Sequence, residues 1–346
     1  MVHVRFHGGA VTEALIGLAA TARGETPTWS DDAPAAVQAA VSAVGDTTGE
    51  VWFHLLPLAL DIDEHAAPDD FLARVAQLEA ADLMRFVVGG NVPAWRECTD
   101  ANDLEAAAAG DRGAGLRLLA NERYYAGRAA DALATLLDAG PERGKQLIVA
   151  ALEAWFDEVV APRLDRIAEL HDSVDRAIPA DEAPLDTVER VTDGFRFEPE
   201  DYTDEVALVP EFAGRSGQVL AQDEGTRIVA YDATSDHKDE LELLAEVFAA
   251  LGEVSRLELL RHLARDPGGV SDLARASGLA KSTTHQHLGV LRDAGVIGLA
   301  GQAWRYRYEV RPARIRNAAA RLLQLLGDPT APSTTPRDNT RTGDHR

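Results

Sequence analysis

Apolar residues recur every three or four positions through much of the N-terminal half of the chain, which is the spacing of amphipathic helices. Glycine and proline separate the runs. The clearest runs are AAVQAAVSAV (35–44), PDDFLARVAQLEAADLMRFV (68–87) and DRGAGLRLLANERYYAGRAADALATLLDAG (111–140). A longer run extends from about Glu142 to Ile178, and Pro162 should kink or divide it. The pattern predicts a mainly helical N-terminal region.

Other stretches of the same region alternate apolar and polar residues, as β-strands do. VHVRF (2–6) predicts a short strand that Gly8 and Gly9 should end. After a polar, proline-bearing break at PADEAPLD (179–186), four further segments predict a meander of strands. They are VERVTDGFRFEP (188–199), EVALVPEF (205–212), SGQVLAQ (216–222) and TRIVAYDA (226–233).

The C-terminal region reads as helices joined by a tight turn. LELLAEVFAAL (241–251) and SRLELLRHLARD (255–266) predict two helices. Ser271 can cap a third, VSDLARAS (270–277), and Gly278 can take the left-handed backbone of a turn before the next helix starts at Lys281. This order is the helix-turn-helix arrangement.

A change of period follows the last of these helices. VIGLA (296–300) and AWRYRYEV (303–310) alternate and predict a hairpin with aromatics on one face and arginines on the other, as in a winged helix. RPARIRNAAARLLQLLG (311–327) then predicts a closing helix. The fold class expected for the whole chain is α+β, mainly helical.

Small and charged residues in ATSDHKDE (233–240) mark the boundary between the two patterns. We therefore expect an N-terminal mixed α/β domain over 1–235 and a winged helix-turn-helix domain over 236–326. The last stretch, 327–346, has no apolar periodicity and should be a disordered tail.

Charge divides the chain at the same place. Residues 247–326 hold 12 basic and 6 acidic residues, a net of +6, whereas residues 1–246 hold 19 and 48, a net of −29. The tail adds three of each sign, so the sum is the total of −23. A basic module beside an acidic body points to a polyanion partner for the module alone.

The polar start of the helix at Lys281 fits that partner. Hydroxyl, amide and imidazole groups there can hydrogen-bond to base edges, and long aliphatic side chains are absent where DNA would lie. Arginines on the hairpin can contact phosphates. The candidate DNA-binding residues are Lys281, Ser282, Thr283, Thr284, His285, Gln286, His287, Arg292, Arg305 and Arg307.

Residues 248–297 resemble the winged-helix domain of ArsR/SmtB-type transcriptional regulators. The recognition segment of that family usually reads as small polar residues, then His-Leu, two residues, Leu, and a step to Ala-Gly; here these are His287, Leu288, Leu291, Ala294 and Gly295. The resemblance covers about residues 240–320. It implies a homodimer joined through the first and last helices of the domain, with recognition helices in successive major grooves of a double-stranded operator. The candidate dimerisation residues are Leu244, Val247, Phe248, Leu251, Ile315, Leu322 and Leu323.

Many members of that family sense metals, through a cysteine pair before the recognition helix or through histidines and carboxylates on the last helix. GGVSDLARAS (268–277) has no cysteine, and RIRNAAARLLQLL (314–326) offers no ligands, so we expect no metal and no cofactor. The body more weakly resembles the large N-terminal domain, of uncharacterised function, of long ArsR-like regulators, at WFDEVVAPRLDRIAEL (155–170) and VALVPEF (206–212).

The leading hypothesis is a cytoplasmic, sequence-specific transcriptional regulator: a dimeric repressor released by a small-molecule or protein effector acting on the N-terminal domain. One cysteine and no run of 18 apolar residues fit a reducing cytoplasm and no membrane span. No phosphate-binding loop, nucleophile elbow or dinucleotide fingerprint is present, so we assign no catalytic residues. Two alternatives stay open: an acidic adaptor that uses the winged helix to bind a protein, and an enzyme domain fused to a DNA-binding domain.

Overall fold

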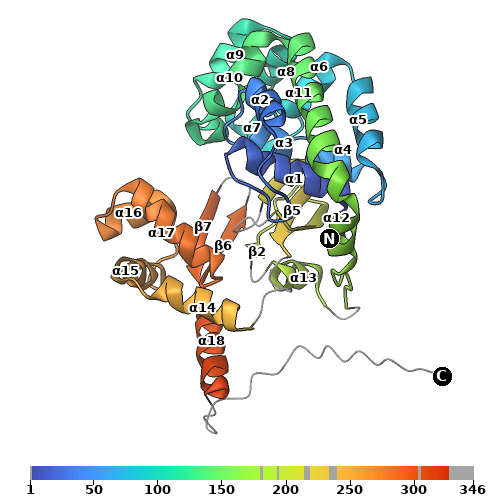
Figure 1. Ribbon diagram of the computed structural model, residues 1–346. Helices are drawn as coiled ribbons and strands as arrows, with labels where there is room; N and C mark the ends of the chain where they lie inside the picture. Colours follow the sequence, from blue (N-terminus) through green and yellow to red (C-terminus); the bar gives the residue numbers. More distant parts are fainter. Residues whose placement is uncertain are drawn as a thin grey trace, which may run out of the picture. The chain divides into compact units, whose positions relative to one another are not determined.

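The computed structural model describes residues 2–179, 182–192, 195–213, 219–233, 240–302 and 305–326. The chain divides into two compact units: Met1–His237 with Gly301–Tyr306, and Lys238–Ala300 with the segment from Arg307 onward. Figure 1 labels the helices and strands of both units. No helix in the described part of the chain is long and apolar enough to cross a membrane.

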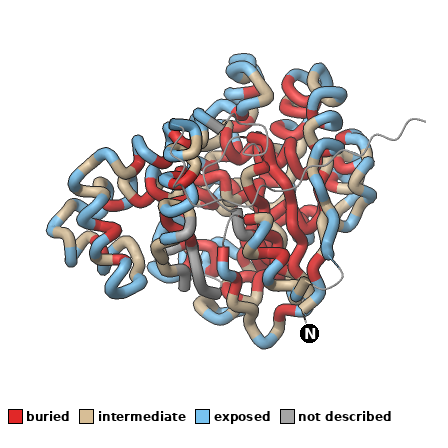
Figure 2. Tube along the Cα trace, turned by 90° about the horizontal axis from the view of Figure 1, so that it is seen from below, coloured by how far each residue is buried: buried red, intermediate tan, exposed pale blue. Residues whose placement is uncertain are grey.

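A four-stranded sheet organises the first unit. Its strands are β1 (His3–Phe6), β3 (Glu205–Glu211), β4 (Val219–Asp223) and β5 (Thr226–Asp232), in the order β1-β3-β5-β4. β1 and β5 run parallel to β3, and β4 is antiparallel to β5. These strands were predicted, but the meander order is wrong. Every residue of β3 after its first is buried, and β1 and β5 pair with its two edges. Figure 2 draws the buried residues of the described chain in red.

The first segment of the predicted meander is also different. Residues 188–191 belong to α13 (Pro184–Val191), which packs against β1, and among the described residues of that segment only β2 (Arg196–Phe197) is a strand. Val188 is buried on the inner side of α13, so its apolar side chain is explained by helix packing and not by a strand.

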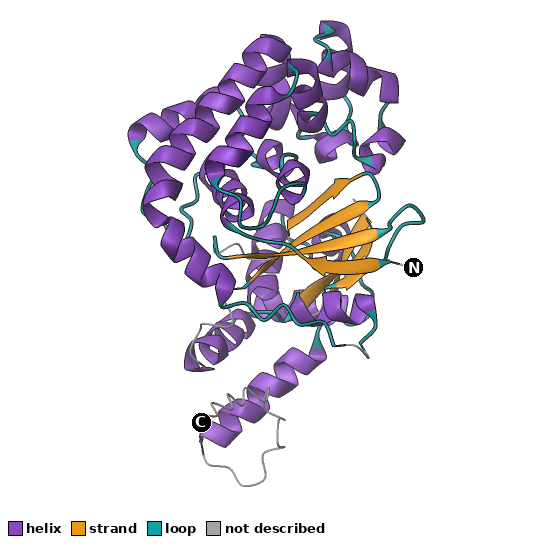
Figure 3. Ribbon diagram, turned by 90° about the vertical axis from the view of Figure 1, so that its right-hand side faces the viewer, coloured by secondary structure: helices purple, strands orange, loops and turns teal. Residues whose placement is uncertain are grey.

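Helices make up the rest of the first unit, and most of them lie on one side of the strands (Figure 3). They are α1 (Ala10–Ala22), α2 (Ala35–Val44), α3 (Glu50–Phe53), α4 (Leu56–Leu60), α5 (Pro68–Gln77), α6 (Ala80–Val87), α7 (Pro93–Cys98), α8 (Ala101–Ala108), α9 (Arg112–Leu119), η1 (Tyr124–Gly127), α10 (Ala129–Ala139), α11 (Pro141–Trp155), η2 (Phe156–Val160), η3 (Ala161–Arg163) and α12 (Leu164–Asp172). As predicted, the long run divides at Pro162, through the π-helical turn η2 and the 3-10 turn η3.

Helix α1 forms the centre of this unit. Its ten consecutive residues Val11–Ala20 are all buried, and the helix contacts β3 as well as α2, α3, α4, α5 and α12. A helix that is covered all round has no polar face, so it carries no helical period that sequence inspection could detect.

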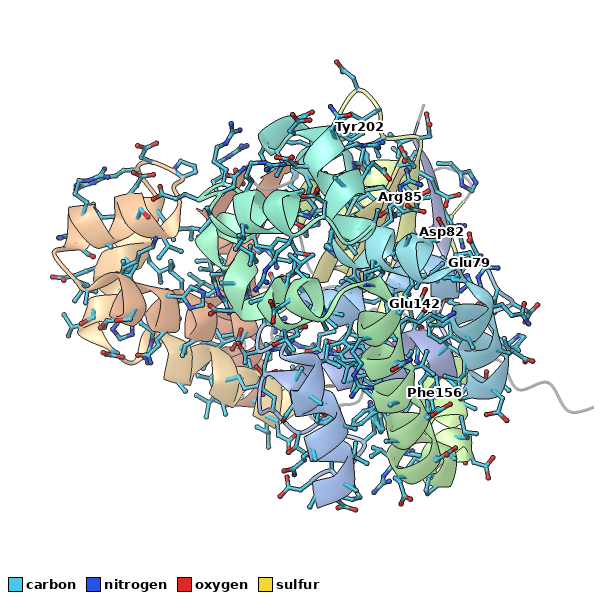
Figure 4. All side chains as sticks on the ribbon, turned by 90° about the horizontal axis from the view of Figure 1, so that it is seen from above. Glu79, Asp82, Arg85, Glu142, Phe156 and Tyr202 are labelled. Carbon is cyan, nitrogen blue, oxygen red and sulfur yellow. The ribbon has the colours of Figure 1, made fainter. Side chains whose placement is uncertain are left out.

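Acidic side chains populate the outer surface of the first unit. Glu79 at the N-cap of α6, Asp82 in its first turn and Glu142 in the first turn of α11 are exposed, and Figure 4 labels all three. The excess of carboxylates counted from the sequence is therefore partly displayed to solvent on these helices.

The second unit contains the predicted order of helices, hairpin and closing helix. Its elements are α14 (Glu240–Leu251), α15 (Val254–Leu263), α16 (Val270–Ser277), α17 (Lys281–Asp293), β6 (Ile297–Gln302), β7 (Arg305–Val310) and α18 (Pro312–Leu325), with the hairpin residues Gly301–Tyr306 grouped with the first unit. Leu259, Leu273, Leu288, Leu291 and Ile297 are buried in one shared core. A β-bridge from Gly268 to Tyr308 joins the α15–α16 connection to β7, a contact that the sequence did not reveal. The α+β fold, mainly helical with a C-terminal winged helix, is confirmed.

Candidate nucleic-acid interface

The turn between α16 and α17 is built as the sequence predicted. Gly278 ends α16 with φ at +72°, and α17 begins three residues later at Lys281. The Ser277 hydroxyl donates to the Leu273 carbonyl at 2.7 Å, which satisfies one group at the end of α16. Ser271 does not cap α16: the helix starts one residue earlier, at Val270, so Ser271 already lies in its first turn.

One face of α17 is anchored in the core. Leu288, Leu291 and Thr284 are all fully buried, and the Thr284 hydroxyl donates to the Ala280 carbonyl at 3.1 Å. Thr284 lies one turn before Leu288 and two before Leu291, so helical geometry turns it inward with them. Its prediction as a DNA contact is therefore wrong.

His287 also faces its own domain. Its side chain is 14% exposed, and Nδ1 lies 3.6 Å from a carboxylate oxygen of Glu253, between α14 and α15. The same Glu253 carboxylate pairs with Arg256, whose Nε donates to the Ala250 carbonyl at the end of α14. This arrangement favours a structural role for His287 over a DNA contact.

The opposite face of α17 is open to solvent. Its exposed residues are Lys281, Ser282, His285, Gln286, Val290 and Asp293, and Thr283 is half-buried. Val290 is 42% exposed, but it lies after the first turns, 281–286, in which no long aliphatic side chain was expected. The polar residues near the start of the helix form the donor and acceptor set that major-groove recognition uses.

The two ends of α17 differ in their hydrogen bonding. At its start, the cap residue Ala280 offers no side chain to the first-turn N–H groups. At its end, Arg314 of α18 donates from Nε to the Ala294 carbonyl at 3.3 Å, placing a cation where the helix dipole is negative. The start of α17 is therefore the end suited to an external anion such as a phosphate.

Strands β6 and β7 form the predicted hairpin, here called the wing. Arg305 begins β7, but its side chain lies outside the described residues. The Arg307 side chain is 40% exposed, with Nε 3.3 Å from Oε1 of Glu309. Arg292 on α17 is 27% exposed and lies 3.7 Å from the Asp293 carboxylate. Arg292 and Arg307 therefore each lie beside a carboxylate of their own domain. A phosphate would have to replace that carboxylate or bind the arginine together with it.

The predicted dimerisation residues divide into buried and exposed sets. Leu244 and Val247 are 7% and 1% exposed within their own domain, so their assignment to a dimer surface is wrong: they pack in the shared core. Leu251, Ile315 and Leu322 are half-buried and pack against the same core. Phe248 and Leu323 stay exposed, at 38% and 40%. Other exposed apolar residues of α14 and at the end of α18 are Leu241, Leu325 and Leu326.

The first unit brings together a histidine and a carboxylate that the sequence did not single out. His171 Nε2 lies 3.3 Å from Oε2 of Glu13, and both side chains are buried. The Glu13 carboxylate also accepts from Trp29 Nε1 at 2.6 Å and from the Phe212 backbone N–H. Both oxygens of the Glu13 carboxylate are hydrogen-bonded to neighbouring protein groups. We therefore interpret this cluster as structural. Within the described ranges, no group of three or more His, Cys, Asp or Glu side chains could hold a metal ion.

Comparisons with known proteins concern the second unit. Residues 257–298, from α15 into β6, match the family model of the IclR helix-turn-helix domain. No curated protein matches the chain. An ArsR-like transcriptional regulator from Rhodococcus sp. RHA1 is 30% identical over 25% of this chain and 81% of its own, with a TM-score of 0.24. A possible transcriptional regulatory protein from Mycobacterium bovis (fragment 1–100) is 28% identical over 25% of this chain and 94% of its own, with a TM-score of 0.21.

The family match and the geometry agree on the same residues. The matched segment contains α16, the turn at Gly278 and α17, which carry the exposed polar face described above. The second unit thus carries a helix-turn-helix DNA-binding domain, and this supports a DNA-binding transcriptional regulator.

Proposed function

We propose that the protein is a sequence-specific repressor that binds a double-stranded DNA operator as a homodimer and is released by an effector acting on the first unit. The observation that carries this proposal is the exposed polar face at the start of α17, held outward by the buried Leu288 and Leu291. A helix anchored on one side and polar on the other is how a recognition helix enters a major groove.

Within this interface we assign two roles. Ser282, His285 and Gln286 read base edges, because their side chains are exposed and can both donate and accept hydrogen bonds. Lys281 and the wing arginines Arg305 and Arg307 hold phosphates, which fixes the position of the protein without reading sequence.

The homodimer rests on the exposed apolar residues Phe248 and Leu323 of α14 and α18, two helices that contact each other. Apolar side chains left in water favour burial against a second copy. The matched family model is of the IclR type, so the ArsR-like character of the domain is proposed on the sequence motif at His287–Gly295.

We assign the effector, a small molecule or a protein, to the first unit. The described part of the second unit consists of the helix-turn-helix, the wing and the helices α14, α15 and α18 that pack with them. A pocket of about 440 Å³ lies between the end of α1 and α2, with Thr21, Gln38 and Ser42 among its lining residues. We propose that the second unit represses by binding the operator and that effector binding to the first unit ends the repression.

Selection of binding sites from random DNA with the full-length protein tests the proposal. We expect enrichment of one sequence and an affinity that falls steeply with salt, with a log–log slope near −7 if about 8 phosphates are neutralised. Gln286→Ala should change the preferred base at one position of each half-site. Thr284→Val should leave the preference unchanged, since Thr284 is buried.

Three results would count against this function. The first is an absence of salt-sensitive binding to any DNA. The second is a change of base preference caused by Thr284→Val but not by Gln286→Ala. Co-purification of a basic protein, with no enriched operator, would favour the adaptor alternative instead.

A further inference from the structure

Gly289 is half-buried and lies in the middle of the face of α17 whose other polar residues are exposed. It lies one turn after His285 and Gln286, one turn before Asp293 and two turns after Ser282, and all four of these residues are exposed. At 100° per residue, Gly289 therefore points in the same direction as the centre of that face, opposite the buried Leu288 and Leu291 side of the helix.

Nothing in the described part of the domain requires a glycine at this position. Its backbone is helical, without a positive φ, and no described atom would lie within 4 Å of a Cβ placed there. The other glycines of the domain contrast with it. Gly278 has φ at +72°, and a Cβ on Gly298 would lie 2.3 Å from the Arg311 guanidinium.

A glycine inside an exposed helix is unfavourable. Relative to alanine it lowers the folding equilibrium constant by about two- to fivefold, because the unfolded chain gains freedom. Gly289 therefore reduces the stability of α17 with no benefit inside the described domain. A partner that packs against this face would supply a benefit that the isolated chain does not have.

We propose that Gly289 is the point of closest approach between the α17 backbone and the DNA, so that base edges or a sugar-phosphate strand of the operator lie against its Cα. This inference rests on the proposed function. With no side chain at Gly289 and only a hydroxymethyl group at Ser282, α17 seats deeper in the major groove, which is where close backbone approach uses glycine. The longer side chains of His285 and Gln286 then reach base edges on either side of this seat.

A single methyl group tests the inference, because stability and binding should change in opposite directions. Gly289→Ala should raise the melting temperature of the full-length protein by roughly 2–4 °C. The same methyl should weaken operator binding by about tenfold, since it must displace DNA packed against the helix. Gly289→Leu should weaken binding further.

Gly113→Ala is the matched control. Gly113 also lies inside a helix, α9 of the first unit, where it is exposed, and a Cβ there would meet only the side-chain ends of Asp111 and Arg117, at 3.2 and 3.4 Å. This variant should keep the affinity of the unmodified protein.

Each result is decisive. If Gly289→Ala binds the operator as tightly as the unmodified protein, the close approach is wrong while the proposed function stands. If Gly289→Ala lowers the melting temperature, glycine serves the fold and the inference is also wrong. If the unmodified protein binds no DNA, the proposed function itself fails.

Discussion

His54 should make the stability of the first unit depend on pH. Its ring is buried at the end of α3, with Nδ1 2.9 Å from the Val87 carbonyl and 3.0 Å from the Tyr125 hydroxyl. Burial lowers the pKa of His54 from 6.5 to about 4, an effect that the nearby backbone carbonyls only partly oppose. The folded unit therefore holds this imidazole neutral.

The sign of the effect follows from proton linkage. Between pH 6.5 and 4 the unfolded chain binds a proton at His54 that the folded unit refuses, so stability falls as the pH falls. The interval of 2.5 pH units corresponds to about 3.5 kcal/mol at about 1.4 kcal/mol per unit, of which about 3 kcal/mol is lost between pH 7 and 4. The full contribution is present above pH 6.5 and is lost by about pH 4.

Urea unfolding at several pH values between 7 and 4 measures this loss, with tryptophan fluorescence as the signal. Trp29, Trp52, Trp95 and Trp155 all belong to the first unit and supply this signal. His54→Asn is the control, because its amide can still donate to the Val87 carbonyl but takes up no proton. Carboxylates that titrate in this range affect the unmodified protein and His54→Asn equally. The difference between their free energies of unfolding should therefore change by about 3 kcal/mol from pH 7 to 4, because only the unmodified protein loses the His54 contribution. A gap that stays constant to within about 0.5 kcal/mol would refute the reasoning.

Two further substitutions test the buried cluster and the dimer. Glu13→Ala should cost about 3–5 kcal/mol in the same urea assay, because it removes the acceptor of both the Trp29 ring N–H and the Phe212 backbone N–H. Glu25→Ala, which removes a 55% exposed partner of Arg23, should cost less than about 1 kcal/mol, and equal costs would contradict the structural role of Glu13. Phe248→Asp should convert the dimer to a monomer in analytical ultracentrifugation, whereas Val254→Asp, at a 72% exposed site on α15, should not. An unmodified protein that sediments as a monomer would disprove the dimer.

Local signals in the sequence predicted the second unit well. Gly278 takes the positive φ that its place between two short helices implied, and α17 starts at Lys281 because the turn needs only two further residues. The alternation around β6 and β7 and the break at Pro162 were equally readable. In each case the conformation depends on a few neighbouring residues, through backbone sterics or side-chain period.

Sequence reasoning failed where the answer depends on distant partners. Helix α1 has no polar face because the sheet and five helices surround it, so it has no period to detect. The parallel pairing of β3 with β1 and β5 joins segments about 200 and 20 residues apart, and no local pattern specifies such a pairing. The cluster around Glu13 was missed for the same reason.

The recognition helix shows both kinds of information at once. Its sequence alone determined that residues 281–293 form a helix after a turn, polar at the start and apolar at Leu288 and Leu291. Only the tertiary structure decided how completely each position is covered: Thr284 is fully buried, whereas Gly289 is half-buried and Val290 is 42% exposed. The physical reason is that rotation of a helix about its axis is set by what it packs against, and that packing partner is remote in the chain.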